Sequence, residues 1–299
     1  MLVILNGGAG PGSGDAPIAA RIAAAFAPLG VNPRIVQPDH TQNISALARE
    51  GASSSEETIV AAGGDGTVNA VAAELAGTDK ILGVLPLGTL NHFAKDLHIP
   101  FALEDAARTV VEGHVAPVDV AEVNGRIFIN NSSLGLYPRI VSQREAQQHR
   151  LARGKWAAFF WATVQAFHRF PFLNLRINFE GKRLTRRSAF LFVGNNPYEI
   201  AGFKLGGRST LNSGKLGLYL THRTGRLGLF RLALRALFGR VDQAKDFEAF
   251  RVEEATIEAR KPRLLVATDG EVNWMEAPLL YRTRPNALRV IVPRNSEPA

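Results

Sequence analysis

The chain has no cysteine among its 299 residues, and no apolar run in it is as long as a membrane span. Without cysteine there is no disulfide, no thiolate metal site and no cysteine nucleophile. The nearest approach to a span, residues 156–167, ends at His168 and falls short of the ~18 apolar residues required. The first apolar run, residues 2–5, is too short for a signal peptide and predicts a strand. We therefore expect a soluble, cytoplasmic protein.

Basic residues outnumber acidic ones, 35 to 27, which gives a net charge of +8 and an isoelectric point near 10.1. Such a protein attracts anions: a nucleotide, a nucleic acid or an anionic membrane. In residues 223–240 arginines alternate with leucine and phenylalanine. This pattern is typical of a basic helix on anionic lipid, or of a core-facing helix with a solvated basic face. The basic stretches contain no recognised nucleic-acid motif, so we expect no nucleic-acid partner.

A glycine-rich segment, Gly-Gly-Asp-Gly-Thr at residues 63–67, joins an apolar run to a helix-like run. Residues 59–62 predict the end of a buried strand, and residues 68–75 predict the first turns of a helix. Gly63, Gly64 and Gly66 carry no Cβ, so backbone N–H groups can approach phosphate oxygens at a helix N-terminus. The alternative is a tight turn that binds no ligand.

Two other loops have the same character. Residues 81–85 are apolar and precede Pro-Leu-Gly-Thr-Leu-Asn at 86–91, and residues 2–5 precede Asn6 and a run rich in glycine. The carboxyl ends of parallel strands meet at one edge of a sheet, where open α/β sheets bind ligands. The three loops therefore predict one site for a phosphate-bearing ligand.

The spacing of apolar runs divides the chain into two parts. Residues 1–118 predict an α/β domain with a parallel, doubly wound sheet, because strands and helices alternate. Its expected strands are 2–5, 32–37, 58–62 and 81–85, and its expected helices are 18–26, 43–48, 68–75 and 103–112. Residues 119–284 predict an antiparallel β-sandwich-type domain, with helical insertions at 142–169 and 224–240. The expected strands from residue 118 onward are 118–123, 126–130, 173–179, 182–184, 189–193, 216–221, 251–258, 264–268 and 288–292. Hairpin signals stand at Asn124-Gly125 and Glu180-Gly181, and we expect a hinge at 115–119.

The chain resembles the diacylglycerol kinase catalytic-domain family, bacterial lipid kinases related to sphingosine and ceramide kinases. The matching motifs are residues 63–67, residues 86–100 and Thr-Asp-Gly-Glu at 268–271, in the family's order. The first motif also occurs in NAD kinases and phosphofructokinases, and the combination is more specific. The resemblance implies a cleft between two domains and a last strand, within 285–299, that returns to the first domain. It also implies ATP and Mg²⁺ as cofactors and a lipid hydroxyl as acceptor, in phospholipid metabolism.

Phosphoryl transfer to an alcohol needs donors around the phosphates, magnesium and a carboxylate that accepts the hydroxyl proton. Asp269 and Glu271 follow a strand-like run and are the expected catalytic pair. The resemblance implies that Glu271 is the general base and that Asp65 and Asp269 hold magnesium. A plain Asp-Gly hairpin turn is the alternative. The expected nucleotide-binding residues are Asn6, Gly63, Gly64, Asp65, Gly66, Thr67, Asn69, Gly88, Thr89 and Asn91.

Two departures from the family pattern are informative. Ala70 stands where the family commonly has glutamate, and Ser213 stands where an aspartate often helps to hold a structural magnesium. We expect an ATP-dependent, diacylglycerol kinase-like lipid kinase that contacts the anionic inner face of the membrane. The alternatives are a catalytically impaired nucleotide- or lipid-binding protein of this fold and an NAD-kinase-like enzyme. The lipid and the oligomeric state are left open.

Overall fold

The computed structural model describes residues 1–7, 17–39, 42–135, 172–201, 204–221 and 247–294. The two expected helical insertions, at 142–169 and 224–240, lie outside the described residues. So does the arginine-rich segment 223–240 on which the membrane prediction rests.

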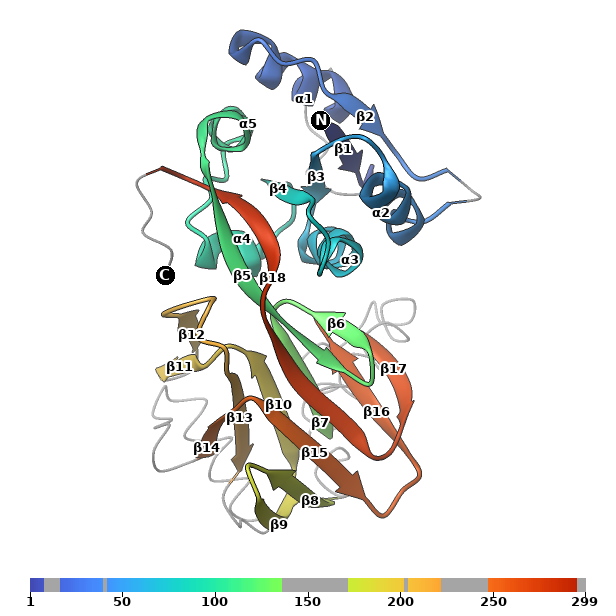
Figure 1. Cartoon of the computed structure of the whole chain (residues 1–299), viewed down its shortest axis with the longest axis vertical. Helices are drawn as coiled ribbons and strands as arrows, with labels where there is room; N and C mark the ends of the chain where they lie inside the picture. The colour runs from blue at the N-terminus through green and yellow to red at the C-terminus, as the bar shows by residue number, and fades with distance from the viewer. Residues whose placement is uncertain (8–16, 40–41, 136–171, 202–203, 222–246, 295–299) are drawn as a thin grey trace, which may run out of the picture.

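The first region contains a parallel sheet with strand order β2-β1-β3-β4. The strands are β1 (Leu2–Leu5), β2 (Arg34–Val36), β3 (Thr58–Gly63) and β4 (Ile81–Pro86). Helix α1 (Ile18–Phe26) packs beside α5 (Leu103–Glu112), and α2 (Ile44–Ser53) packs beside α3 (Asp65–Leu75). Figure 1 shows the two helix pairs on opposite faces of the sheet. Both faces are covered, so β1, β3 and β4 are almost wholly apolar, and the doubly wound prediction is confirmed.

Helix α3 begins earlier than the sequence predicts, at Asp65 rather than Val68. Gly64 caps it in an extended conformation, and its carbonyl accepts hydrogen bonds from Thr67 and Val68 at 2.9 and 3.1 Å. The glycine-rich segment therefore forms the first turn of the helix instead of a separate loop. Asp65 suits this position, because a carboxylate in the first turn interacts favourably with the helix dipole.

The second region is antiparallel, as predicted. A six-stranded sheet has the order β14-β13-β10-β7-β16-β17, and a separate pair joins β11 to β12. Its strands are β7 (Asn131–Gly135), β10 (Phe190–Asn195), β11 (Tyr198–Ala201), β12 (Lys204–Arg208), β13 (Leu216–Thr221), β14 (Phe247–Val252), β16 (Arg263–Thr268) and β17 (Glu271–Glu276). The sequence analysis missed β7, β11, β12 and β17, and took residues 251–258 for one strand where the chain turns from β14 into β15.

The other layer of this region continues the parallel sheet. Strand β18 (Leu279–Val292) follows β4, and then come β15 (Glu254–Ala259), β8 (Leu173–Phe179) and β9 (Lys182–Ser188), while β5 (His114–Val123) pairs with β18 and β6 (Arg126–Phe128). The β5–β6 and β8–β9 connections are hairpins whose turn residues, Asn124-Gly125 and Glu180-Gly181, have positive φ. Both hairpin predictions are confirmed.

A two-stranded ribbon of β5 and β18 links the two regions (Figure 1). Near its end, Arg289 and Val290 pair in parallel with Ile81 and Leu82 of β4. The expected hinge at 115–119 lies within the continuous strand β5, where Pro117 is opposite Arg289, and hinge motion there stays a prediction. Two buried apolar clusters meet along this ribbon, where Val120 belongs to one and Ala121 to the other. The division at residue 118 stays a prediction.

No helix among the described residues is long and apolar enough to cross a bilayer.

Candidate active site

Three strand ends meet at one edge of the parallel sheet. After β1, the Asn6 amide donates to the carbonyl of Ala62 at 3.0 Å, and its side chain donates to the Thr67 hydroxyl at 3.1 Å. After β4, the Leu87 amide donates to the carbonyl of Gly63 at 2.9 Å. These bonds tie Asn6 and the second loop to the glycine-rich turn between them. The structure thus brings Asn6 together with two of the expected loops, the glycine-rich turn and the second loop, while residues 8–16 of the first loop lie outside the described residues.

The glycines of these loops lie in different surroundings. A Cβ on Gly88 would lie 2.4 Å from the Gly64 Cα, and a Cβ on Gly63 would lie 2.4 Å from the Thr67 hydroxyl. Gly64 and Gly88 are small because the two loops pack backbone to backbone, and Gly63 is small because the Thr67 side chain lies against it. Gly66 differs, because a Cβ there would meet nothing within 4 Å. Access of a ligand to the backbone at Gly66 stays a prediction.

Asn91 closes the second loop on itself. Its backbone is left-handed, with φ 50°, and it precedes the short helix α4 (His92–Asp96). Its side-chain oxygen accepts from the Gly88 amide at 3.1 Å, and its side-chain nitrogen donates to the Gly88 carbonyl at 2.8 Å. Both ends of the Asn91 amide are engaged, so it shapes the loop that carries Thr89, which is exposed. A contact of Asn91 with nucleotide stays a prediction.

Asn69 lies in the second turn of α3, below the glycine-rich turn. Its side chain is 8% exposed, and its oxygen has no hydrogen-bond partner among the described residues. A buried acceptor without a partner is costly, and such groups concentrate at functional sites. Asn69 thus fits its place among the expected site residues, although its role stays a prediction.

The acidic motif forms the tight turn between β16 and β17. Asp269 and Gly270 have φ of 46° and 88°, and Thr268 pairs with Glu271. The Asp269 carboxylate accepts three backbone N–H bonds, from Ile129 at 2.8 Å, Asn130 at 2.9 Å and Asn131 at 2.8 Å. Residues 129–131, between β6 and β7, therefore form a backbone nest around this carboxylate.

The two carboxylates of the motif lie in different environments. Burial raises the pKa of Asp269 to about 6, and the three N–H bonds and Arg208 oppose that rise. A base that titrates near neutrality is well matched to general base catalysis. The Glu271 side chain is 58% exposed and forms an ion pair with Arg126, whose Nε donates to the Thr268 hydroxyl at 3.0 Å. Asp269 is thus buried with a raised pKa whereas Glu271 is exposed, and which of the two acts as base stays a prediction.

Strand β6 contacts both helix α3 and the acidic turn. Its side chain Ile127 packs against the core of the first region. Arg126, at the start of β6, reaches Glu271 and Thr268. Figure 1 shows β6 lying against α3, with β16 and β17 beyond it. Strand β6 therefore lies between helix α3, which begins in the glycine-rich turn, and the hairpin that carries the acidic turn.

Acidic side chains near the loops are the candidate ligands for magnesium. No group of three or more acidic, histidine or cysteine side chains in the described part of the chain forms a metal cage. Mg²⁺ commonly needs only one or two carboxylates beside substrate phosphates. Asp65, at the first position of α3, fits that role. Asp269 fits it less well, since three N–H bonds leave about one of its roughly four acceptor positions. Both assignments stay predictions.

The turn at Ser213 is closed by hydrogen bonds. The amide and the hydroxyl of Ser213 both donate to the Asn196 side-chain oxygen, at 2.9 and 2.5 Å. The buried carboxylate of Asp119 accepts from the amides of Gly214 at 2.7 Å and Asn286 at 2.9 Å. Asp119 was missed by the sequence analysis, although a carboxylate flanked by valines in the apolar run 118–121 is a signal that could have found it.

Three other polar residues near the site were also missed. Arg126 contacts Glu271, and the buried Arg208 pairs with Asp96. No local pattern marks them, because an arginine after Asn-Gly or Gly-Gly looks like an ordinary turn residue.

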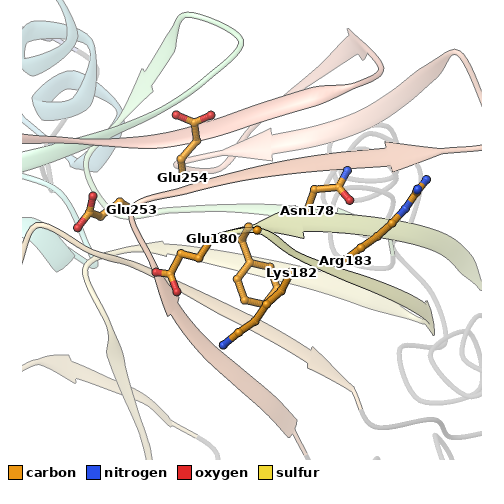
Figure 2. Close-up of a pocket in the computed structure, with 8 residues that line it drawn as sticks. Asn178, Glu180, Lys182, Arg183, Glu253 and Glu254 are labelled. Carbon is orange, nitrogen blue, oxygen red and sulfur yellow. The ribbon is translucent and has the colours of Figure 1, made fainter.

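A surface hollow lies elsewhere, at the β8–β9 hairpin (Figure 2). It is lined by Asn178, Phe179, Glu180, Gly181, Lys182, Arg183, Glu253 and Glu254. Figure 2 shows the labelled side chains fanning outward rather than converging on one point. None of the expected site residues lines it, so we do not place the active site there.

Two family models cover most of the chain. Residues 1–123 match the diacylglycerol kinase catalytic domain, and residues 138–292 match the YegS C-terminal NAD kinase beta sandwich-like domain. The chain belongs to the diacylglycerol kinase and YegS-like family. The resemblance drawn from the three sequence motifs is therefore confirmed.

Individual members of the diacylglycerol kinase and YegS-like family match over shorter stretches. A Bacillus subtilis (strain 168) protein named diacylglycerol kinase is 34% identical over 201 residues, 64% of each chain. A Cronobacter sakazakii protein named probable lipid kinase YegS-like is 40% identical over 121 residues, 39% of each chain. Each match spans less than two thirds of the relative. A solved structure of a diacylglycerol kinase from Bacillus anthracis str. Sterne has the same fold, with a TM-score of 0.69 at 22% identity over 97% of this chain and 96% of that one.

Proposed function

We propose that this protein is an ATP-dependent lipid kinase that transfers the γ-phosphoryl group to a hydroxyl of a diacylglycerol-like lipid. The observation that carries the proposal is that β6 contacts α3, whose glycine-rich N-terminus is open at Gly66, while Arg126 of β6 contacts Thr268 and Glu271 of the acidic turn. Phosphoryl transfer depends mainly on positioning and electrostatic stabilisation, which the helix N-terminus and the acidic turn would supply.

ATP is expected to lie across the three loops. The first-turn amides of α3 would donate to phosphate oxygens, and Asp65 together with the phosphates would hold Mg²⁺. Bound magnesium would offset the negative charge of the phosphates. Asn6, Thr67 and Asn91 would then keep the loops in place through the hydrogen bonds described above.

The lipid half of the proposal is supported by one face of the six-stranded sheet. Cross-strand partners share a face, and Phe192 pairs with Ser133, Ala267 with Val272, and Leu265 with Trp274. This face is opposite to the one whose side chains, such as Leu134 and Val266, enter the core. Trp274 is 66% exposed. The apolar face begins next to the acidic turn, so a lipid hydroxyl at the turn would leave its acyl chains along it. We expect the enzyme to work at the inner face of the cytoplasmic membrane.

A catalytically impaired binder of the same fold is the second candidate. It is favoured by the ion pair that engages Glu271 and by the residues Ala70 and Ser213. An NAD-kinase-like activity is a third reading, and the apolar face does not favour it.

A screen of labelled ATP against lipid extracts in mixed micelles, with and without Mg²⁺, tests the proposal. We expect a phosphorylated lipid that forms only with Mg²⁺ and is absent with a Gly66→Val variant. ATP binding without product from any lipid would support the impaired binder, and phosphorylation of NAD would support the third reading.

A further inference from the structure

We propose that Arg208 is a positioning residue for phosphoryl transfer, because it joins helix α4, behind the second nucleotide loop, to the backbone nest that holds Asp269. The inference rests on the proposed function. It concerns a side chain that lies outside all three sequence motifs.

The guanidinium of Arg208 forms an ion pair with Asp96 of the first region. Its side chain is fully buried, at 0% exposed, and its Nε and Nη2 atoms lie 2.8 and 2.7 Å from one carboxylate oxygen of Asp96. Asp96 is the last residue of α4, which begins directly after Asn91. Arg208 is itself the last residue of β12, in the second region. This ion pair therefore crosses from the β-rich region to the helix behind the second loop.

The Nη1 and Nη2 atoms of Arg208 also donate hydrogen bonds to the segment that surrounds Asp269 and to its neighbour Asn195. Nη1 donates to the carbonyls of Ile129 at 2.6 Å and Asn195 at 3.1 Å, and Nη2 donates to the Asn130 side-chain oxygen at 3.0 Å. A guanidinium has five N–H groups in a fixed plane, and here all three nitrogens are engaged. A lysine could not reproduce this set, since an ammonium has no planar fork.

Hydrogen bonds thus hold the nest on both sides. The amides of residues 129–131 point to the Asp269 carboxylate, while the carbonyls of residues 129 and 130 accept bonds from Arg208, Asn195 and Tyr198. The Tyr198 ring also faces the guanidinium, 5.3 Å from ring centre to Cζ. A shift of α4 would therefore be transmitted through Arg208 to the carboxylate of the acidic turn.

The energetics favour a positioning role. A buried ion pair often adds little to stability over an apolar pair of similar size, because both charges lose their hydration. It does fix the relative placement of the groups that it joins. A misplacement of about 1 Å can cost on the order of 10² in rate. Placement is what two halves of an active site on separate regions require.

The test uses Arg208→Lys and Asp96→Asn in the full chain, with Glu248→Gln as control. Glu248 of β14 pairs with Arg186 of β9 at 2.9 Å, in a partly buried ion pair that lies outside the three sequence motifs. Measurements are kcat, the KM for ATP, the folded fraction, and hydrogen exchange of the amides of 129–131. We expect both variants to lower kcat by about 10–100-fold at unchanged KM and folded fraction, and to speed exchange at 129–131. The control should change neither quantity.

The inference is overturned if kcat per folded molecule matches the wild type, or if exchange at 129–131 is unchanged in both variants. Asp96→Asn keeps every other contact of Arg208, so it decides the matter if Arg208→Lys does not fold. If the wild-type protein makes no phosphorylated lipid, the proposed function fails. The exchange measurement, which needs no substrate, then decides whether Arg208 holds the nest.

Discussion

The glycine-rich turn after β3 and the acidic turn after β16 are held in place by opposite means. Neighbouring backbone holds the first: Gly64 lies against Gly88, and Asn91 closes the second loop on Gly88. Residues far away in the sequence hold the second: the amides of 129–131 grip Asp269, and Arg126 reaches Glu271. Local packing leaves a strong sequence pattern, while long-range polar contacts leave almost none.

The largest expected effect distinguishes Gly66, in the glycine-rich turn, from Gly88, in the second loop. We predict that Gly66→Val abolishes ATP binding while the protein stays folded, because a side chain there meets no protein atom but would occupy the space in front of the helix N-terminus. Ala73→Val, which adds the same branched side chain to the last turn of α3, should bind ATP normally. Gly88→Ala should behave differently and lower stability by about 1–3 kcal/mol, since its Cβ would lie 2.4 Å from the Gly64 Cα.

Calorimetric titration with ATP and urea unfolding measure these outcomes. Normal ATP affinity in Gly66→Val would contradict nucleotide binding at the glycine-rich turn. Full stability in Gly88→Ala would show that the two loops do not need their close contact.

This contrast explains which features of the fold and of the site could be predicted from the sequence. The parallel sheet and the convergence of Asn6 with Thr67 followed from apolar runs that end in glycine, since such patterns are local. Strands β7 and β17 were missed because Asn-Ser-Ser-Leu-Gly and Glu-Val-Asn-Trp-Met-Glu carry little strand preference of their own, and their partners decide their state. The nest around Asp269 depends on a pairing 140 residues away in the chain, which no local pattern encodes.

The second effect concerns the chemical step. We predict that Glu271→Gln lowers kcat by a factor on the order of 10²–10⁴ with little change in ATP affinity, because the amide cannot accept the hydroxyl proton. Asp269→Asn should lower kcat as well, and it should also lower stability, because its amide nitrogen cannot accept the N–H bonds of residues 129–131. Single-turnover kinetics with the identified lipid distinguish the two carboxylates. Wild-type turnover in Glu271→Gln would move the role of base to Asp269.

The third effect is a pH dependence that belongs to Asp269. Its pKa in the folded protein, about 6, lies above its ordinary value, so the folded state binds this proton more tightly than the unfolded chain does. Its contribution to stability is complete below about pH 4 and is lost as the pH rises through about 6. We predict that the stability of the wild type relative to Asp269→Asn falls between these values, as measured by urea unfolding at each pH. A difference that does not change with pH would contradict the raised pKa.

The smallest effect tests whether the exposed ion pair at Glu271 serves the reaction or only the surface. Arg126→Gln should change stability by less than about 1 kcal/mol, because exposed ion pairs contribute little. We nevertheless expect a fall in kcat of roughly threefold to tenfold, since a loss of about 1 kcal/mol in orienting the base corresponds to that range. Arg263→Gln is the matched control, because Arg263 pairs with Glu276 at 3.2 Å across the other end of the same hairpin. It should match Arg126→Gln in urea unfolding and the wild type in kcat. Equal kcat in the two variants would assign the Arg126 pair to the surface, and Glu271 would then be oriented by the turn alone.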